Sequence, residues 1–392
     1  MISPTLLRGI TWDHSRGYLP LVATAQRFNE LRPDIRITWE KRSLQDFEDA
    51  PVEVLGQDYD FVVLDHPCIG RVVKAGVLLP LDRHIPAGFL ADQAENSVGQ
   101  SHASYTWEGN QWALAIDAAA PVAVWRQDLM DAAGLVPPQD WSGLLDLGRR
   151  GHIEVPGAPV HALMNFLMMC LAVGETPFAT AERVVDPEVA EIALVHLREL
   201  MALCPESCWA RNPIHSHDLM ASAENTTARY CPFAYGYSNY SRPGYAARIL
   251  TCGEPPRFEN RPLQTVLGGA GLAIFAGRPA RREAVAYAEF VADAETQRTL
   301  YTHNGGQPGH RQAWVDAENN HLTGNFFAAT LAVLDRAFVR PRFDGYFRFQ
   351  AEAAPLVQDC LRGIVPLRAT ATRLNTLYHQ TTSAAPFPHE TT

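Results

Sequence analysis

The chain has 392 residues, 47% of them hydrophobic, and carries a formal net charge of -10 at pH 7. That length and composition predict two domains that each bury a core. Positive charge comes almost entirely from scattered arginines, with Lys41 and Lys74 the only lysines, so no basic surface suited to a phosphate backbone is predicted and we expect no nucleic-acid partner.

The sequence shows no sign of membrane insertion or export. No apolar run approaches the ~20 residues of a membrane span, and the first predicted strand begins at Leu6, which leaves no room for a signal peptide before it. The cysteines favour reduced thiols because they are odd in number and irregularly spaced: Cys68, Cys170, Cys204, Cys208, Cys231, Cys252 and Cys360. We expect a cytoplasmic monomer from the chain as it reads, or a periplasmic one if an export signal has been removed.

The first third of the chain alternates strand and helix. Residues 8–12 predict a buried strand, and residues 19–33 place apolar side chains at helical spacing up to Pro33. Residues 34–42 alternate apolar and polar side chains, as a strand with one buried face does, and residues 58–67 contain a nearly continuous apolar strand. Strand, helix and strand in this order build right-handed parallel units.

Polar residues directly follow three of these strands, and ligands gather at the carboxyl ends of parallel strands. They are Asp13 and His14, Lys41 and Arg42, and Asp65 and His66. Trp12 and Arg16 flank the first pair and join the candidates. The alternative is structural: Asp13 or Ser15 is the N-cap of the following helix, and Asp65 caps in the same way while His66 faces outward.

The middle of the chain, residues 118–262, is expected to be mainly helical. One helix is predicted to end at Gly134, a second covers residues 161–174, and a third covers residues 187–204. The second is apolar nearly all round, which indicates a buried helix.

The chain then returns to strand at residues 265–276. A long amphipathic helix is expected from Pro279 to a glycine stop at Gly305 and Gly306. Further helical patches lie at residues 328–337 and 355–363.

Four passages in this order resemble the extracellular solute-binding proteins of ABC importers, in the sugar-binding branch that includes maltose-binding protein. They are "HSRGYLPLVATAQRFNELRPDIRITWE", "YDFVVLDHPCIGRVVKAGVLLPLDRHI", "WALAIDAAAPVAVWRQDLMDAAGL" with "PPQDWSGLLDL", and "LGGAGLAIFAGRPARREAVAYAEFVADAETQRTLYTHNGGQPGHRQAW". The resemblance implies an α/β fold of the type II periplasmic-binding-protein kind, in which two lobes close around a ligand by a hinge motion.

The lobes that the resemblance implies are discontinuous in sequence and joined by hinge strands. Lobe one would comprise residues 1–117 and 265–312, and lobe two residues 118–264 and 313–392. The chain would therefore cross between lobes near Asp117 and Gln264, and a third time near residues 312–315.

The passage "YGYSNYSRPGY", from Tyr235 to Tyr245, combines aromatic faces with many hydrogen-bonding groups. Sugar-like ligands need both, and the resemblance puts this loop near the cleft. The candidate ligand contacts in it are Tyr235, Tyr237, Ser238, Asn239 and Tyr240. The alternative is a surface loop that the phenol groups stabilise by bonding to backbone.

Glycine-rich turns supply a further group of candidates: Gly268, Gly269, Gly306, Gln307 and His310. Glycine lets backbone approach a ligand closely, although a helix C-cap or a tight strand crossing also explains these glycines. Asp117, at the first predicted crossing, completes the set. Arg16, Arg42 and His310 would suit a carboxylate on the ligand.

Four residues, Cys204, Cys208, His215 and His217, are enough in number for a metal site. Their spacings differ from the common zinc patterns, so buried thiols and surface histidines are the preferred interpretation. The nucleotide-binding glycine fingerprints are missing from the sequence, and we expect no cofactor and no metal.

Two functions remain open at this point. As a binding protein of ABC-transporter type, the chain would capture a sugar, sugar acid or small organic acid and, if exported, deliver it to permease subunits. As an isomerase or lyase on the same fold, it would use Asp13 with His14, or Asp65 with His66, for acid–base chemistry. Binding is preferred because no catalytic constellation is recognisable beyond common residue types.

Overall fold

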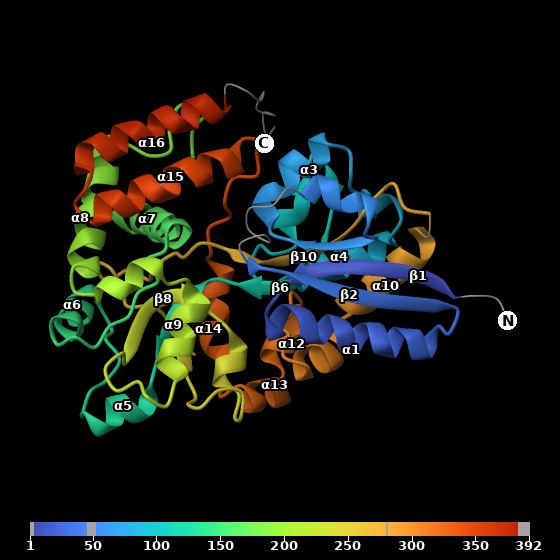
Figure 1. Cartoon of the computed structure of the whole chain (residues 1–392), viewed down its shortest axis with the longest axis horizontal. Helices are drawn as coiled ribbons and strands as arrows, with labels where there is room; N and C mark the ends of the chain where they lie inside the picture. The colour runs from blue at the N-terminus through green and yellow to red at the C-terminus, as the bar shows by residue number, and fades with distance from the viewer. Residues whose placement is uncertain (1–3, 45–51, 280, 383–392) are drawn as a thin grey trace.

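The computed structural model describes residues 4–44, 52–279 and 281–382, which form two lobes (Figure 1). The first lobe is built on a five-stranded sheet in the order β2-β1-β3-β10-β6. β1 runs parallel to β2 and β3, whereas β10 is antiparallel to both of its neighbours. The strands are β1 (Thr5–Trp12), β2 (Ile35–Arg42), β3 (Phe61–Leu64), β6 (Leu114–Ala119) and β10 (Gly268–Ile274).

Helices cover both faces of this sheet. α1 (Ser15–Leu31) and α10 (Arg281–Ala292) pack together on one face, and α3 (Ile69–Lys74) packs on the other. The alternation in β2 buries Ile35 and Trp39 against the first of these layers, as predicted. Shorter elements complete the lobe: η1 (Val52–Gln57), η2 (His66–Cys68), η3 (Leu81–Arg83), α4 (Ala87–Glu95), η4 (Ala103–Tyr105), β4 (Thr106–Trp107) and β5 (Asn110–Gln111).

The N-cap of α1 is not the residue that was expected. His14 is the cap, because its Nδ1 accepts a hydrogen bond from the backbone N–H of Arg16 at 3.0 Å. Asp13 is exposed instead and forms an ion pair with Lys41 at 2.7 Å. The parallel pairing of β1 with β2 brings these two strand ends together, so Asp13 has a cation within reach and is not used as a cap.

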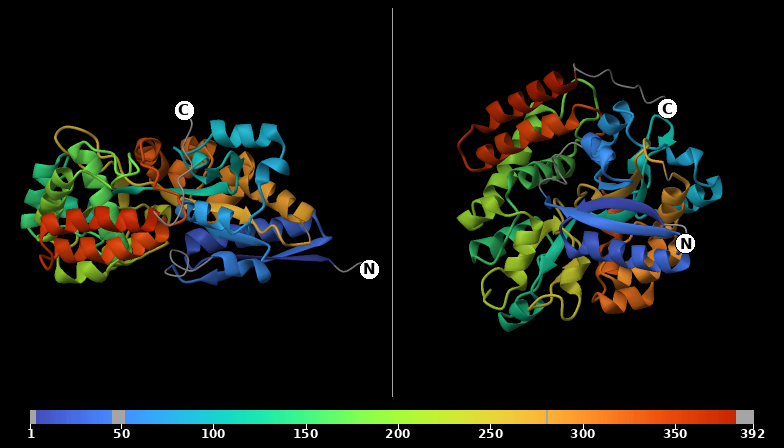
Figure 2. Two further views of the ribbon diagram at one scale, coloured as in Figure 1. Left: turned by 90° about the horizontal axis from the view of Figure 1, so that it is seen from above. Right: turned by 45° about the vertical axis from the view of Figure 1, so that its right-hand side comes forward.

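The second lobe combines a three-stranded sheet with a layer of helices. The strands β7 (Pro121–Trp125), β8 (Tyr230–Tyr235) and β9 (Thr251–Gly253) lie in the order β8-β7-β9. α15 and α16 lie side by side at the outer edge of this lobe (Figure 2). The helices are α5 (Gln127–Ala132), α6 (Trp141–Arg149), α7 (Pro159–Val173), α8 (Pro187–Met201), η5 (Glu206–Ala210), α9 (Pro213–Ala221), η6 (Ser238–Ser241), α15 (Tyr346–Leu361) and α16 (Leu367–Thr382).

The buried helix expected at residues 161–174 is confirmed as α7, in which every residue from 161 to 170 is buried. The helix expected to end at Gly134 was predicted to begin at Val122, and this start is wrong, since residues 121–125 form the central strand β7. Pairing on both edges buries this segment, and its β-branched valines suit a strand. The three-stranded sheet of the second lobe was therefore not predicted, because the region that contains it was expected to be mainly helical.

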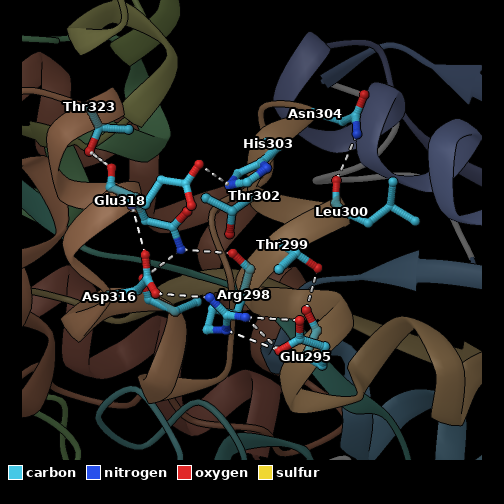
Figure 3. Close-up of polar contacts among 12 residues, drawn as sticks. Glu295, Arg298, Thr299, Leu300, Thr302, His303, Asn304, Asp316, Glu318 and Thr323 are labelled. Carbon is cyan, nitrogen blue, oxygen red and sulfur yellow. Dashed lines mark hydrogen bonds and ion pairs between the residues drawn. The ribbon is translucent and has the colours of Figure 1, made fainter.

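The long helix expected up to Gly305 is interrupted at Asp293. The Asp293 carboxylate caps a new start, α11 (Ala294–Thr296), by accepting from two backbone N–H groups, and the chain continues as the π-helix η7 (Gln297–Tyr301). Arg298 joins this segment to α13 through ion pairs with Glu295 and Asp316 (Figure 3). The elements that follow are α12 (Arg311–Val315), α13 (Ala317–Leu322) and α14 (Phe326–Asp335).

No helix within residues 4–44, 52–279 and 281–382 combines the length and apolar character that a membrane span requires. All seven cysteines lie in these ranges, and each is a free thiol.

Gln307 joins the parts of the chain that meet between the lobes. Its side chain donates to the carbonyls of Ala118, at 2.8 Å, and Gly236, at 3.2 Å, and accepts from the Ser238 backbone N–H at 3.0 Å. The side chain is 1% exposed. One amide thus ties the end of β6 to the loop that follows β8.

Replacing Gln307 with leucine is expected to lower the free energy of unfolding by about 2–4 kcal/mol, because the buried Ala118 carbonyl and Ser238 N–H each lose a hydrogen bond and the Gly236 carbonyl keeps only the one from Arg16. Denaturant unfolding measures the change. The matched control is Gln26→Leu, an exposed position on α1, where the change should stay within about 0.5 kcal/mol. Equal effects of the two substitutions would show that Gln307 does not hold this junction.

Candidate functional site

A cavity of about 80 Å³ lies where the two lobes meet. The first lobe lines it with the ends of β1, β3, β6 and β10, and the second lobe lines it with α7, α9, the end of β8 and the chain around α15. This volume has room for several water molecules. The carboxyl ends of β1 and β3 therefore lie beside a space that both lobes line.

Arg16 and Asp117, which both line this cavity, form a buried ion pair. Arg16 donates from Nε and Nη2 to the two carboxylate oxygens of Asp117, at 2.8 and 2.5 Å, and from Nη1 to the Gly236 carbonyl at 3.0 Å. Burial opposes the charge of Arg16, but the carboxylate of Asp117 raises the pKa of Arg16 above its ordinary value. All three nitrogens of this guanidinium are engaged by protein groups.

Asp65 and Arg340 form a second ion pair, with Arg340 donating from Nη2 to Asp65 Oδ2 at 2.5 Å. Burial would raise the pKa of Asp65, but the charge of Arg340 and the hydrogen bond with His66 hold it at about 2. The Nε of Arg340 is buried and has no hydrogen-bond partner in the described part of the chain. This guanidinium is therefore only partly satisfied by the protein.

The second lobe contributes two more polar side chains to the cavity wall. His161, on α7, is 7% exposed, and burial lowers its pKa to about 3, so its imidazole is neutral at physiological pH. Gln350, on α15, is 3% exposed, and its Oε1 finds no hydrogen-bond partner among the described residues. A buried polar atom without a partner is uncommon in a folded protein and needs an explanation.

The structure brings eight of the predicted site residues together around the cavity: Trp12, Arg16, Asp65, Asp117, Tyr235, Tyr237, Gly268 and Gly269. Gly269 has a φ of +105°, and a Cβ there would lie 2.4 Å from the Asp117 carbonyl oxygen. A glycine is needed at this position because the two strands approach so closely. The part that these eight residues take in binding stays a prediction.

The other ten predicted residues do not line the cavity: Asp13, His14, Arg42, His66, Ser238, Asn239, Tyr240, Gly306, Gln307 and His310. Several have structural partners instead. Asn239 donates to the Gly305 carbonyl, Tyr240 donates to Asp218, and His310 lies 3.3 Å from an oxygen of Asp92. The expectation that His66 faces outward is wrong, because it is 1% exposed, although Asp65 does accept from its backbone N–H.

Some residues of the tyrosine-rich passage, Tyr235 to Tyr245, line the cavity and others do not. Tyr235 and Tyr237 line the cavity, and the Tyr237 ring lies 4.5 Å from the Arg16 guanidinium. Tyr245 lies outside the cavity lining, where its hydroxyl is 2.8 Å from Ser15 Oγ and 3.3 Å from His14 Nε2. The passage is therefore partly a cavity wall and partly a contact between the loop and the start of α1.

Sequence reasoning missed ten residues that line the cavity: Leu44, Ala119, Val160, His161, Met164, Pro213, Ala270, Arg340, Phe347 and Gln350. One signal was present. Tyr346, Phe349, Ala353 and Val357 form a buried stripe at helical spacing along α15, and Gln350 is a polar residue on that stripe. No comparable sequence pattern marks Arg340, because it lies in an extended segment whose apolar residues do not recur at helical or strand spacing.

Within the described residues, no group of three or more histidine, cysteine, aspartate or glutamate side chains is arranged to hold a metal ion. Cys204, Cys208, His215 and His217 do not assemble into such a group. Cys208 is buried, as expected, but the expectation of a surface histidine is wrong for His217, which is 1% exposed. His217 packs against Tyr237 and Tyr240, with ring centroids 5.8 and 5.1 Å away.

No protein-family model and no curated protein matches the sequence. Solved structures match in fold. Maltose-bound MalE3 of T. maritima has a TM-score of 0.81 at 16% identity, over 96% of this chain and 99% of that one. An ABC transporter solute-binding protein from Agrobacterium radiobacter K84, in complex with ribitol, has 0.78 at 16% identity, over 96% and 99%.

A third such protein, from Thermotoga lettingae TMO and bound to α-D-tagatose, has a TM-score of 0.79 at 17% identity, over 95% of this chain and 100% of that one. The fold of the chain is thus the two-lobed α/β fold of maltose-binding-like solute-binding proteins, type II of the periplasmic-binding kind. The resemblance drawn from the sequence is confirmed at this level.

Acid is expected to destabilise the fold partly through His217. Burial, together with the charges of His14 and Arg16, lowers the pKa of His217 to about 3, whereas an unfolded histidine titrates near ~6.5. The unfolded chain therefore binds the proton first, so the stability that His217 contributes is present above pH ~6.5 and is lost as the pH falls. Between pH 7 and pH 5 the loss is about 2 kcal/mol.

The measurement is the free energy of unfolding at both pH values in the wild type and in His217→Phe. The variant should lose about 2 kcal/mol less than the wild type over this interval. An identical pH dependence in the two proteins would mean that His217 is not buried as a neutral ring. His379→Phe is the control, at an exposed histidine near the end of α16.

Proposed function

We propose that the chain is a binding protein that captures a small, neutral, hydroxylated ligand, a sugar or a polyol, between its lobes and releases it unchanged. The observation that carries this proposal is the cavity between the lobes, on whose lining Arg340 Nε and Gln350 Oε1 are buried without partners in the described part of the chain. Leaving such groups unpaired costs about 1–3 kcal/mol each. A ligand with hydroxyl groups would offset that cost, because each hydroxyl both donates and accepts.

Aromatic side chains on the cavity wall support a ligand with a carbon skeleton of this kind. Trp12 and Tyr237, from opposite lobes, and Phe347 present rings to the space, and the C–H faces of a sugar or polyol pack against such rings. A ligand that contacts both lobes would bind the closed form more tightly than the open form. That difference in affinity is what allows a ligand to drive closure by a hinge motion.

Charge balance favours a neutral ligand over a sugar acid or a small organic acid. Each arginine on the described cavity wall is paired with a carboxylate: Arg16 with Asp117, and Arg340 with Asp65. A ligand carboxylate would meet these aspartates without an uncompensated cation to receive it. Arg42 and His310, which the sequence suggested for that purpose, lie outside the lining.

The similar solved structures support the same assignment. Their names give maltose, ribitol and α-D-tagatose as bound ligands, which are neutral sugars and a polyol. Two of them are named as ABC transporter solute-binding proteins, and we accordingly propose ABC permease subunits as the partner. The lobe boundaries expected from the sequence, with crossings near Asp117 and Gln264, are proposed together with this function.

Ligand binding is expected to raise the melting temperature, because selective binding to the folded state stabilises it by mass action. A thermal-shift screen of neutral sugars, polyols, sugar acids and dicarboxylates tests this, with mass analysis of each ligand afterwards. A neutral sugar or polyol should stabilise the protein and be recovered intact. A chemically altered ligand would make the protein an enzyme, and stabilisation by acids alone would overturn the neutral ligand.

The cavity itself is tested by filling it. Val160→Trp places a large ring at a partly exposed position on the cavity wall, and it should abolish the thermal shift while the protein still melts cooperatively. Val195→Trp, on the exposed side of α8, is the matched control and should keep the full shift. A ligand that still stabilises Val160→Trp would bind elsewhere.

The enzyme alternative requires that one of the two aspartate–histidine pairs lies at the cavity, where it could exchange protons with a ligand. Neither His14 nor His66 lines the cavity, and Asp13 is exposed. We expect Asp13→Asn to keep the ligand dissociation constant within about twofold, and Asp65→Asn to raise it by roughly tenfold or more. Isothermal titration calorimetry checks both. Equal effects of the two substitutions would contradict the assignment of Asp65 to the cavity.

A further inference from the structure

We propose that Arg340 and Gln350, with Asp65 opposite them, form a subsite for two neighbouring hydroxyl groups of the ligand, and that this subsite decides which sugars or polyols bind. The inference rests on the proposed function and adds to it the residues that set specificity. Both new residues come from the C-terminal part of the chain, outside every passage that suggested a site.

Arg340 is held as a directional donor. It is 5% exposed, and its Nη2 is fixed by Asp65 at 2.5 Å. The segment that carries it is also fixed, because Phe338 exchanges two 2.7 Å backbone hydrogen bonds with Thr265 and Leu267. With one corner of the guanidinium bound in this way, its Nε–H is left without a partner and can be given to a ligand oxygen.

Gln350 is held as a directional acceptor. It lies on α15, which is anchored by the fully buried rings of Tyr346 and Phe349. Gln350 is 3% exposed and lines the cavity, and its Oε1 has no partner in the described part of the chain. An unpaired buried acceptor destabilises a fold, so an apolar side chain here would serve the fold better. A role in binding explains the glutamine.

A pair of adjacent hydroxyls matches this arrangement of groups. One hydroxyl oxygen accepts from Arg340 Nε–H and donates its own proton to Asp65, while its neighbour donates to Gln350 Oε1. Hydrogen bonds to charged groups are the stronger kind, and a site built to bond a hydroxyl rejects the analogue that lacks it. A carboxylate would satisfy Arg340 but would face Asp65 and leave Gln350 without a donor.

His161 completes the electrostatic setting of the subsite. It lines the same cavity, and the nearby charge of Arg340 adds to burial in keeping its ring neutral. A neutral imidazole presents one donor and one acceptor, so it extends the hydrogen-bonding surface without adding charge. The balance between Arg340 and Asp65 is left undisturbed.

The test uses ribitol, D-tagatose and maltose as probes in isothermal titration calorimetry, with the mono-deoxy analogues of the probe that binds best. Gln350→Met removes the acceptor and nearly conserves volume, and Arg340→Lys keeps the charge beside Asp65 but removes the Nε–H. Each substitution should raise the dissociation constant of that probe by roughly tenfold to a hundredfold. The deoxy analogue that lacks the bonded hydroxyl should bind the wild type weakly and lose less than about twofold more in the variant.

A second readout separates binding from a structural role. Without ligand, Gln350→Met should melt at the same temperature as the wild type or higher, because it removes an unpaired buried acceptor. A melting temperature several degrees lower would give Gln350 a structural role and overturn the subsite. So would unchanged affinities in both variants, and in that case the proposed function would stand. Failure of every neutral sugar and polyol to bind the wild type would overturn both.

Discussion

The arrangement of the two lobes depends on the buried contact of Arg16 with Asp117 and the Gly236 carbonyl. It joins the first turn of α1, the last residues of β6 and the loop after β8, which are elements far apart in the chain. A buried ion pair is costly to desolvate and contributes little net stability, but removing either partner leaves a buried charge uncompensated. Its value here is geometric, since it specifies how three segments meet.

The buried polar side chains near this contact differ in how completely the protein satisfies their hydrogen bonds. Arg16 and Gln307 have their hydrogen bonds completed by protein atoms, and they hold the junction together. Arg340 and Gln350 are buried to a similar degree, yet each retains an atom without a partner. These two unpaired atoms are the ones that the proposed function assigns to a ligand.

The sequence was informative wherever local periodicity and strand ends decide the structure. The alternation in β2, the apolar run of β3 and the all-apolar α7 were predicted because each follows from the side-chain period of its own element. Trp12, Arg16 and Asp65 were found as cavity residues because Trp12 is the last residue of β1 and the other two follow the ends of β1 and β3, where parallel strands expose their carboxyl ends. The resemblance to solute-binding proteins was carried by the order of such elements.

What the sequence alone determined about this protein is therefore its fold class and the polar part of the first-lobe wall of the cavity. Only the tertiary structure decided that Asp13 turns to Lys41, that Gln307 belongs to the junction, and that Arg340 reaches Asp65 across 275 positions of the chain. The physical reason is that a side chain's hydrogen-bond partners are set by packing between distant segments. Local sequence patterns predict which face of a helix or strand is buried, but they do not predict which residues of other segments will contact that face.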